Sequence, residues 1–188
     1  MSAISHDHDA DDEAYGRDDD DDAEAELTVE ALIWQLLLRI NPGDEEAAAQ
    51  QLQEWQDACA QAGADDVESV VLLRRVIDWK SGFHVEAGDA AGLVQCIDEL
   101  SARFGLRIDW GVEDPTDAAF LAAADVPTLI GRAHEQLREH GYTLWTWSMN
   151  EAPREDVFAG WITLRSDDES MEIIAPALGI ALRPGSAF

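Results

Sequence analysis

The sequence predicts an α+β fold, in which a small, mostly antiparallel sheet is covered by helices and preceded by a helical N-terminal half. Two patterns lead to this prediction. Apolar residues recur at helical spacing between residues 28 and 104, whereas several later segments alternate between apolar and polar residues as strands do. Glycine, proline and asparagine lie between the segments and mark their ends.

The helical half is predicted to span residues 27–105. Its helices are expected over residues 28–40, 44–61, 66–79 and 89–104. Thr28 is placed to cap the first helix, and Asn41-Pro42-Gly43 ends it. The first two helices are expected to pack as an antiparallel pair. The third is apolar around much of its circumference and is predicted to be the most buried of the first three. His84 falls in the loop that follows it.

The sheet-containing half is predicted to span residues 106–188. Strands are expected over residues 106–110, 142–149, 157–164 and 180–182, and helices over residues 116–124, 126–140 and 168–178. A short connection joins the second and third of these strands, so a hairpin is the simplest topology. Asp167 is placed to cap the last helix. Both halves are predicted to form a single domain over residues 27–188.

Tryptophan is concentrated in the predicted strands, at positions Trp110, Trp145, Trp147 and Trp161. Trp145 and Trp147 share one face, because side chains alternate along a strand. If that face is the core, Leu144 and Thr146 face outwards and the tryptophans form a large aromatic core beneath the helices. If it faces solvent, it is an exposed aromatic patch suited to a protein partner or an apolar ligand.

Acidic residues dominate the chain. Residues 1–26 contain twelve acidic side chains and one basic side chain, with almost no large apolar residue, which predicts a disordered acidic tail. The remaining 162 residues still carry 28 acidic and 11 basic side chains. Such a surface repels phosphate backbones, which argues against binding to nucleic acids or anionic membranes. It attracts basic proteins, cations and polyamines, although genome composition or a salt-rich habitat would also produce this excess.

Motifs that carry a reaction mechanism are missing from the sequence. It contains no phosphate-binding glycine loop, paired-cysteine zinc spacing or His-Glu-x-x-His pattern. No cofactor, metal ligand or catalytic residue is therefore predicted. The run from Asp7 to Asp18, with His6 and His8, matches a calcium-binding loop poorly, since Asp12 stands where the sharp turn needs glycine.

The candidate binding residues lie at strand ends and loops of the predicted sheet. They are the tryptophans Trp110, Trp145 and Trp161 and the carboxylates Glu113, Asp114, Asp167 and Asp168. Carboxylates in such positions can hold Mg²⁺ or carry out acid/base chemistry. They can equally cap helices, as the positions of Asp114 and Asp167 indicate.

The cysteines and the hydropathy pattern indicate a cellular location. Cys59 and Cys96 fall at apolar-compatible positions of predicted helices and are expected to be buried free thiols. The N-terminus has no signal-peptide pattern, and no apolar run is long enough to span a bilayer. A cytoplasmic protein is therefore expected, and its oligomeric state is not indicated.

Four short motifs of the C-terminal half carry a resemblance to a known family. They are Ile108-Asp109-Trp110 with Glu113-Asp114, Gly141-Tyr142-Thr143-Leu144-Trp145, Phe158-Ala159-Gly160-Trp161 and Leu178-Gly179-Ile180. Through these motifs, residues 100–185 resemble a bacterial family classified only as a domain of unknown function. The resemblance implies a bacterial cytoplasmic protein and lends no catalytic residues.

The leading hypothesis from the sequence is a non-enzymatic protein that binds a basic protein partner. Such a protein would be immunity-like or inhibitor-like toward a basic toxin or nuclease. The alternative is a small-ligand-binding protein or a metal-dependent enzyme with an acidic cleft between the helical half and the sheet. Trp110 or Trp161 would then form an apolar wall beside the candidate carboxylates. A structural adaptor without a pocket is a third hypothesis.

Overall fold

A computed structural model describes residues 28–63, 66–77, 80–148 and 157–187. Its helices are α1 (Val29–Ile40), α2 (Glu45–Ala62), α3 (Asp66–Val76), α4 (Ala90–Ala102), α5 (Ala118–Ala123), α6 (Val126–Glu139) and α7 (Asp168–Ala177). Its strands are β1 (Gly82–Glu86), β2 (Tyr142–Ser148), β3 (Val157–Leu164) and β4 (Ala181–Pro184), with short 3-10 helices η1 (Arg165–Asp167) and η2 (Gly185–Ala187). Helices together with an antiparallel sheet confirm the predicted α+β class.

Local signals set the ends of the first two helices. Thr28 Oγ1 accepts a hydrogen bond from the backbone N–H of Ala31 at 3.2 Å, and Asp44 Oδ1 accepts one from Ala47 at 3.0 Å. Gly63 ends α2 in the left-handed conformation, with a φ of 60°. These residues satisfy backbone groups that would otherwise be unpaired, or allow the chain to leave the helix without strain. Such signals are local, which is why the sequence predicted these boundaries to within a residue or two.

One antiparallel sheet joins the strands in the order β1-β3-β2-β4. β2 and β3 pair in the register that places Trp145 opposite Trp161, which confirms their predicted pairing. The connection between them, residues 149–156, lies outside the described residues. β4 pairs with β2 alone, as predicted for a short edge strand near residues 180–182.

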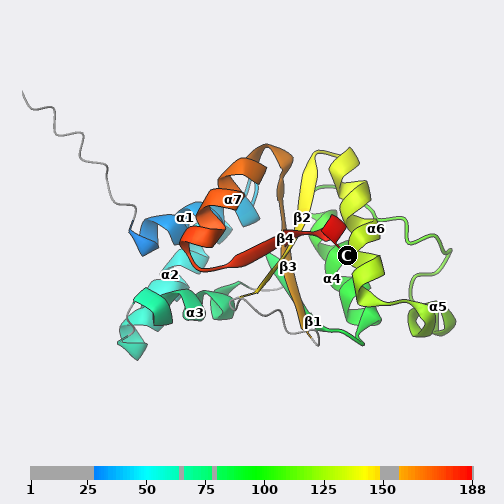
Figure 1. The fold of residues 1–188 in the computed structure, drawn as a ribbon, viewed down its shortest axis with the longest axis horizontal. Coiled ribbons are helices and arrows are strands. Elements are labelled where there is room, and N and C mark those ends of the chain that lie inside the picture. The colour runs from blue at the N-terminus through cyan, green and yellow to red at the C-terminus, as the bar shows by residue number, and fades with distance from the viewer. Residues whose placement is uncertain (1–27, 64–65, 78–79, 149–156, 188) are drawn as a thin grey trace, which may run out of the picture.

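Helices cover both faces of the sheet (Figure 1). The helices α1, α2, α3 and α7 lie on one side, and α4 and α6 lie on the other. Trp145 and Trp161 belong to the core on the first side, whereas Leu144 and Ile162 belong to the core on the second. Neighbouring residues of one strand therefore point into different cores, because strand side chains alternate.

The tryptophans of β2 and β3 form the aromatic core that one of the two interpretations predicted. Trp145 is 4% exposed and Trp161 is fully buried, and Trp147 stacks on Trp161 with ring centroids 5.1 Å apart. The outward orientation expected for Leu144 and Thr146 is wrong, since both are buried. Helices also cover the second face, so both sides of the sheet are enclosed, which the alternation of apolar and polar residues did not indicate.

Gly160 leaves room for the ring of Phe83, its cross-strand neighbour on the edge strand β1. A Cβ atom at Gly160 would lie 2.5 Å from the ring of Phe83 and would also meet the carbonyl oxygen of Trp145. Phe83 is one of the buried residues of β1, so its ring has little freedom to move away. Any larger residue at Gly160 would therefore separate β1 from β3 or displace the phenyl ring.

β1 is a strand where the sequence analysis expected a loop around His84. Buried Phe83 and Val85 alternate with exposed His84 and Glu86. A run of this length is too short for its period to be distinguished from that of a loop. Because β1 belongs to the predicted helical half, residues from both halves build the sheet.

The burial of α3 also differs from the prediction. Val71 of α3 is 49% exposed, whereas Ile33, Leu36 and Leu37 of α1 are fully buried. α1 is therefore the more deeply buried helix among the described side chains. Apolar residues all around a short helix do not require burial on every side.

A ring of buried polar side chains joins the N-terminal helices to the sheet. Asn41 Nδ2 donates to Gln51 Oε1 at 2.8 Å, and Gln51 Nε2 donates to Ser81 Oγ at 2.8 Å. Ser81 Oγ closes the ring by donating to Asn41 Oδ1 at 2.6 Å. The three residues are 1%, 5% and 1% exposed. Because each donor in the ring meets an acceptor, these groups can be buried without a large desolvation penalty.

Two further expectations concern the cysteines and the membrane. Cys59 and Cys96 are free thiols, as predicted, but both are partly exposed rather than buried. In the part of the chain that the structure describes, no helix combines the length and the apolar character needed to cross a membrane.

Candidate functional site

The segment over residues 106–110 has no regular secondary structure, so its prediction as a strand is wrong. Two side chains of α6 take the place of a strand partner. Gln136 donates from Nε2 to the carbonyl oxygen of Asp109 at 2.9 Å and accepts from its backbone N–H at 2.8 Å. Arg132, one turn earlier on α6, donates to the carbonyl oxygen of Trp110. Side chains of α6 therefore form hydrogen bonds with backbone groups of this segment that have no strand partner, and these bonds hold the segment in place.

Asp98 and Trp110 meet where this segment crosses α4. Trp110 is 2% exposed within the second core, and its indole Nε1 donates to Asp98 Oδ1 at 3.0 Å. In the described part of the chain, the other carboxylate oxygen of Asp98 accepts no hydrogen bond. Asp98 therefore keeps acceptor capacity that a ligand could use.

Two adjoining cavities share Asp98 as a lining residue. One encloses about 230 Å³ beside Arg107, Asp109 and Trp110, and the other encloses about 370 Å³ beside Val94, Glu99 and Leu121. Pro115 lines both cavities as well. We refer to the two together as the Asp98 cleft. Its walls are α4, which contributes both apolar and polar side chains, and the segment after Leu106.

The surroundings of Asp98 change the pKa of its carboxyl group. Burial raises its pKa above the usual value of 3.8, while the hydrogen bond from Trp110 and the charge of Arg107 act in the opposite direction. Burial disfavours the ionised form because water is displaced from the carboxylate. A cation that enters the cleft would replace the lost hydration and favour ionisation.

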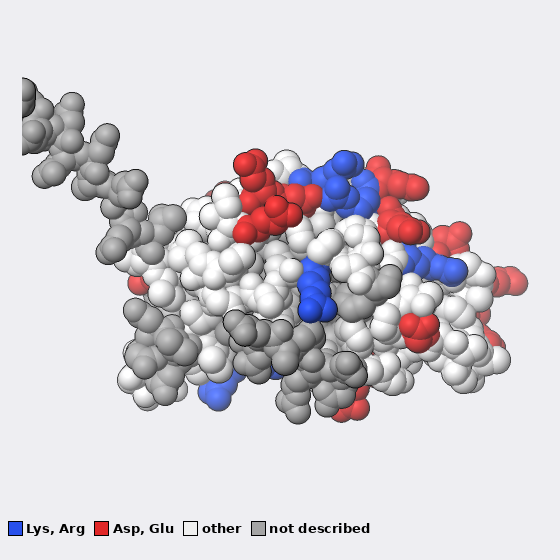
Figure 2. Space-filling view, viewed as in Figure 1, with Lys and Arg blue, Asp and Glu red and all other residues white. Residues whose placement is uncertain are grey.

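Acidic groups surround this cleft and other parts of the surface. Asp98, Glu99 and Asp109 line the cleft, against the single guanidinium of Arg107 among its described lining residues. Figure 2 shows acidic side chains over α7 and around α5 and α6, with a group of basic side chains between them. The field at the cleft therefore attracts cations and repels anions.

Two of the sequence-predicted carboxylates lie next to this cleft without lining it. Glu113 and Asp114 are exposed, although their neighbours Val112 and Pro115 contribute to the wall. Asp114 Oδ1 accepts hydrogen bonds from the backbone N–H of Thr116 at 2.8 Å and from its hydroxyl at 2.6 Å. These bonds lower the pKa of Asp114 and keep it ionised.

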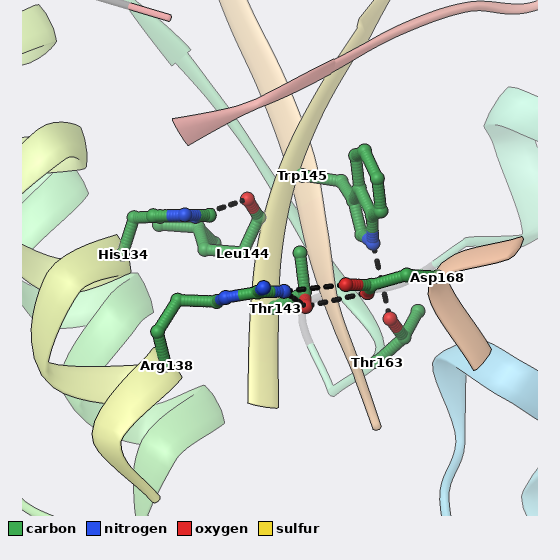
Figure 3. Close-up of polar contacts among 7 residues, drawn as sticks. All are labelled: His134, Arg138, Thr143, Leu144, Trp145, Thr163 and Asp168. Carbon is green, nitrogen blue, oxygen red and sulfur yellow. Dashed lines mark hydrogen bonds and ion pairs between the residues drawn. The ribbon is translucent and has the colours of Figure 1, made fainter. Parts of the chain in front are cut away.

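Asp168 belongs to a different cluster, at the start of α7 (Figure 3). It forms an ion pair with Arg138 of α6, and its Oδ1 accepts a hydrogen bond from Thr143 Oγ1 at 2.6 Å. Arg138 also donates to Thr143 Oγ1 at 2.7 Å. Every group in this cluster has a partner from another element, so it connects α6, β2 and α7. Asp167 occupies the capping position of α7, but its side chain makes no capping bond there, contrary to the prediction.

His134 lies behind the same part of β2. Its Nδ1 is 3.0 Å from the carbonyl oxygen of Leu144, so Nδ1 carries the proton and donates it. The side chain is 5% exposed. Burial lowers the pKa of His134, which favours the neutral ring in the folded protein. This histidine was not a candidate in the sequence analysis, and its contacts are those of a core residue.

The predicted tryptophans are divided between the two faces of the sheet. Trp145 and Trp161 are cross-strand partners in the first core, and Trp145 Nε1 donates to Thr163 Oγ1 at 3.0 Å. Trp110 lies in the second core. The structure therefore does not bring Trp110 and Trp161 to one wall, and Asp168 lies in a separate cluster from the Asp98 cleft.

Asp98 was missed by the sequence analysis. It follows Ala91 and Val94 along one side of α4, an apolar stripe that ends in a carboxylate. That interruption is the one available signal, but acidic residues beside apolar stripes are common on surface helices.

Among the described residues, no three His, Cys, Asp or Glu side chains cluster as a metal site would require. The acidic run with His6 and His8 lies outside the described residues.

Comparison with known proteins identifies a family but no characterised relative. No curated protein and no solved structure matches the chain. The family match extends through the N-terminal helices, so it is wider than the resemblance over residues 100–185 indicated. The chain belongs to the family described as a domain of unknown function (DUF6630), whose model matches residues 32–185.

Proposed function

We propose that this protein is a non-enzymatic binding protein for a basic protein partner, and that the Asp98 cleft receives a lysine or arginine side chain of that partner. The observation that carries the proposal is the partly buried carboxylate of Asp98, which lies where two cavities meet and keeps one oxygen without a hydrogen bond in the described structure. An immunity-like or inhibitor-like role toward a basic toxin or nuclease is consistent with this chemistry.

The cleft supplies both kinds of contact that a long basic side chain needs. Val94 and Leu121 offer apolar surface to the methylene groups, while the carboxylates of Asp98 and Glu99 face the charged end. A charge-assisted hydrogen bond in a partly desolvated site is stronger than one on open surface. The acidic remainder of the surface would steer such a partner toward the protein and raise its association rate.

The test is a calorimetric titration of the full chain with an unstructured lysine-rich peptide, at low and at physiological ionic strength. Asp98→Asn is expected to weaken binding about tenfold, since removing one charge of a partly buried pair has an effect of this order. Glu172→Gln is the matched control, because Glu172 is an exposed carboxylate of α7 and the change removes the same charge. This control should bind within about twofold of the unmodified protein.

Two outcomes would count against the proposal. Equal weakening by Asp98→Asn and Glu172→Gln would mean that the peptide responds only to overall charge. Specific thermal stabilisation by Mg²⁺ or Mn²⁺, beyond that given by NaCl at the same ionic strength, would instead favour a metal-dependent site and the enzyme alternative.

A further inference from the structure

A second groove, whose described charged lining residues are basic rather than mainly acidic as in the Asp98 cleft, runs along β1. It encloses about 620 Å³ and is lined by residues of α3 and β1, together with Cys96 of α4 and Trp147 of β2. It has no lining residue in common with the Asp98 cleft. The groove has the size of a typical site for a small organic ligand, about 300–1,000 Å³.

Basic side chains line this groove although the protein is strongly acidic. Arg74 and Arg75 of α3 and His84 of β1 line it, and all three side chains are exposed. None of the described lining residues is acidic. Neither arginine forms an ion pair within the described part of the chain. The whole sequence has 12 basic against 40 acidic side chains, so two neighbouring arginines in a groove with no carboxylate among its described lining residues create a local positive potential.

An aromatic and apolar wall lies beside these cations. The guanidinium carbon of Arg74 is 5.9 Å from the ring centroid of Trp147, which in turn stacks on Trp161 at 5.1 Å. Val71, 49% exposed, adds apolar surface on the same side. The indole Nε1 atoms of Trp147 and Trp161 are buried without a hydrogen-bond partner in the described structure. The wall therefore presents ring surface and aliphatic carbon rather than hydrogen-bonding groups.

The geometry points to a binding site for a small anionic molecule with a flat aromatic or heteroaromatic group. Arg74 and Arg75 hold its carboxylate, phosphate or sulfonate, and the flat group packs against Trp147 and Val71. Arginine suits this role, because its planar guanidinium pairs with such anions in a bidentate manner and also stacks on aromatic rings. A long polyanion is disfavoured, since the whole chain carries 40 acidic against 12 basic side chains. This inference does not depend on the proposed partner, which requires the opposite charge and different residues.

The probe for the test is 8-anilinonaphthalene-1-sulfonate, an aromatic anion whose fluorescence rises in an apolar environment. The full chain is expected to bind it at one saturable site, and inorganic phosphate should compete for the arginines. The double variant Arg74→Gln/Arg75→Gln should weaken binding at least tenfold. The matched control Arg165→Gln/Arg183→Gln removes the same charge from exposed arginines outside the groove and should bind within twofold of the unmodified protein.

The uncharged analogue N-phenyl-1-naphthylamine distinguishes the proposed site from a merely apolar surface. It should bind far more weakly than the sulfonate, and equally weakly to both double variants. Equal binding of the two dyes would overturn the inference, and so would equal affinity of the sulfonate for the two double variants. Urea denaturation of both variants shows whether each is folded, so a loss of binding can be assigned to the arginines.

Discussion

Asp98 has two properties that oppose each other. Its carboxylate is partly desolvated beside Trp110, which raises its pKa and makes the ionised form unfavourable in the folded protein. The same desolvation would strengthen a bond to an incoming cation. A residue that serves binding at some expense of stability is common in functional sites. Its replacement should therefore change stability and binding in opposite directions.

Asp98→Asn is expected to raise the free energy of unfolding at pH 7 while it weakens binding of the lysine-rich peptide. The folded-state pKa of Asp98 lies above its ordinary value of 3.8, so its contribution to stability is lost as pH rises through the folded-state pKa. An asparagine oxygen can still accept the hydrogen bond from Trp110. Urea denaturation measures the effect, and a lower midpoint for Asp98→Asn would make Asp98 a structural residue instead.

His134 should make stability depend on pH in the opposite direction. Burial lowers its folded-state pKa below the ordinary 6.5, so the unfolded chain binds the proton more readily and stability falls as pH decreases below about 6.5. Glu135, Arg138 and Asp168 also act on this ring, but burial is the largest influence. His134→Asn can keep a donor to the carbonyl oxygen of Leu144 while removing the titration.

The measurement for His134 is urea denaturation of both proteins between pH 7.5 and pH 5, a range of about one unit or more on each side of the ordinary histidine pKa. The unmodified protein is expected to lose more stability than His134→Asn over this range. Other groups titrate in both proteins, so their effects cancel in the difference. Parallel pH profiles would show that His134 does not change its protonation on unfolding.

At the level of elements, the buried ring of Asn41, Gln51 and Ser81 explains how α1 and α2 are fixed to the start of β1. Ser81→Ala removes one member and leaves Gln51 Nε2 and Asn41 Oδ1 without that partner. The expected loss is about 1–3 kcal/mol in the free energy of unfolding. Chemical denaturation measures it.

Ser101 provides a control for the Ser81 prediction. It is also buried, but its hydroxyl has no hydrogen-bond partner in the described structure. Ser101→Ala should therefore leave stability unchanged to within about 0.5 kcal/mol, or raise it, since no bond is lost. Similar losses in the two variants would mean that the side-chain ring contributes little beyond the volume of a hydroxyl group.

The helices were largely predictable from the sequence because their signals are local. Caps such as Thr28 and Asp44, together with apolar periodicity, are present within each segment. β1 and the segment at residues 106–110 were predicted incorrectly because their partners come from elsewhere in the chain. β1 pairs with a strand that begins at Val157, and the side chain of Gln136 bonds to the backbone of Asp109. No local pattern contains this information.

The candidate site was less predictable than the fold. The sequence identified Trp110 and the acidic character of the surface, and the structure places Trp110 against Asp98. Asp98 itself was not identified, because on a helix it resembles any solvated acidic residue. Its position at the junction of two cavities depends on how the segment after Leu106 crosses α4, which is a property of tertiary structure.

At the scale of the whole molecule, charge is distributed unevenly rather than spread as a uniform acidic shell. The Asp98 cleft lies beside α4 on the side of the second core, and the charged groups among its described lining residues are three carboxylates and one guanidinium. The groove along β1 is lined by Arg74, Arg75 and His84. Ligands of opposite charge would therefore be directed to different parts of the molecule.

The most direct test follows the indole N–H signals of the tryptophans by NMR during a titration with the lysine-rich peptide. The chain has seven tryptophans, and single Trp→Phe variants assign their signals. The Trp110 signal is expected to shift most, because its Nε1 donates to Asp98 Oδ1 at 3.0 Å, while those of Trp145 and Trp161 in the other core stay in place. Small shifts spread over all tryptophans, with Trp110 unaffected, would contradict the proposal that the Asp98 cleft receives the basic partner.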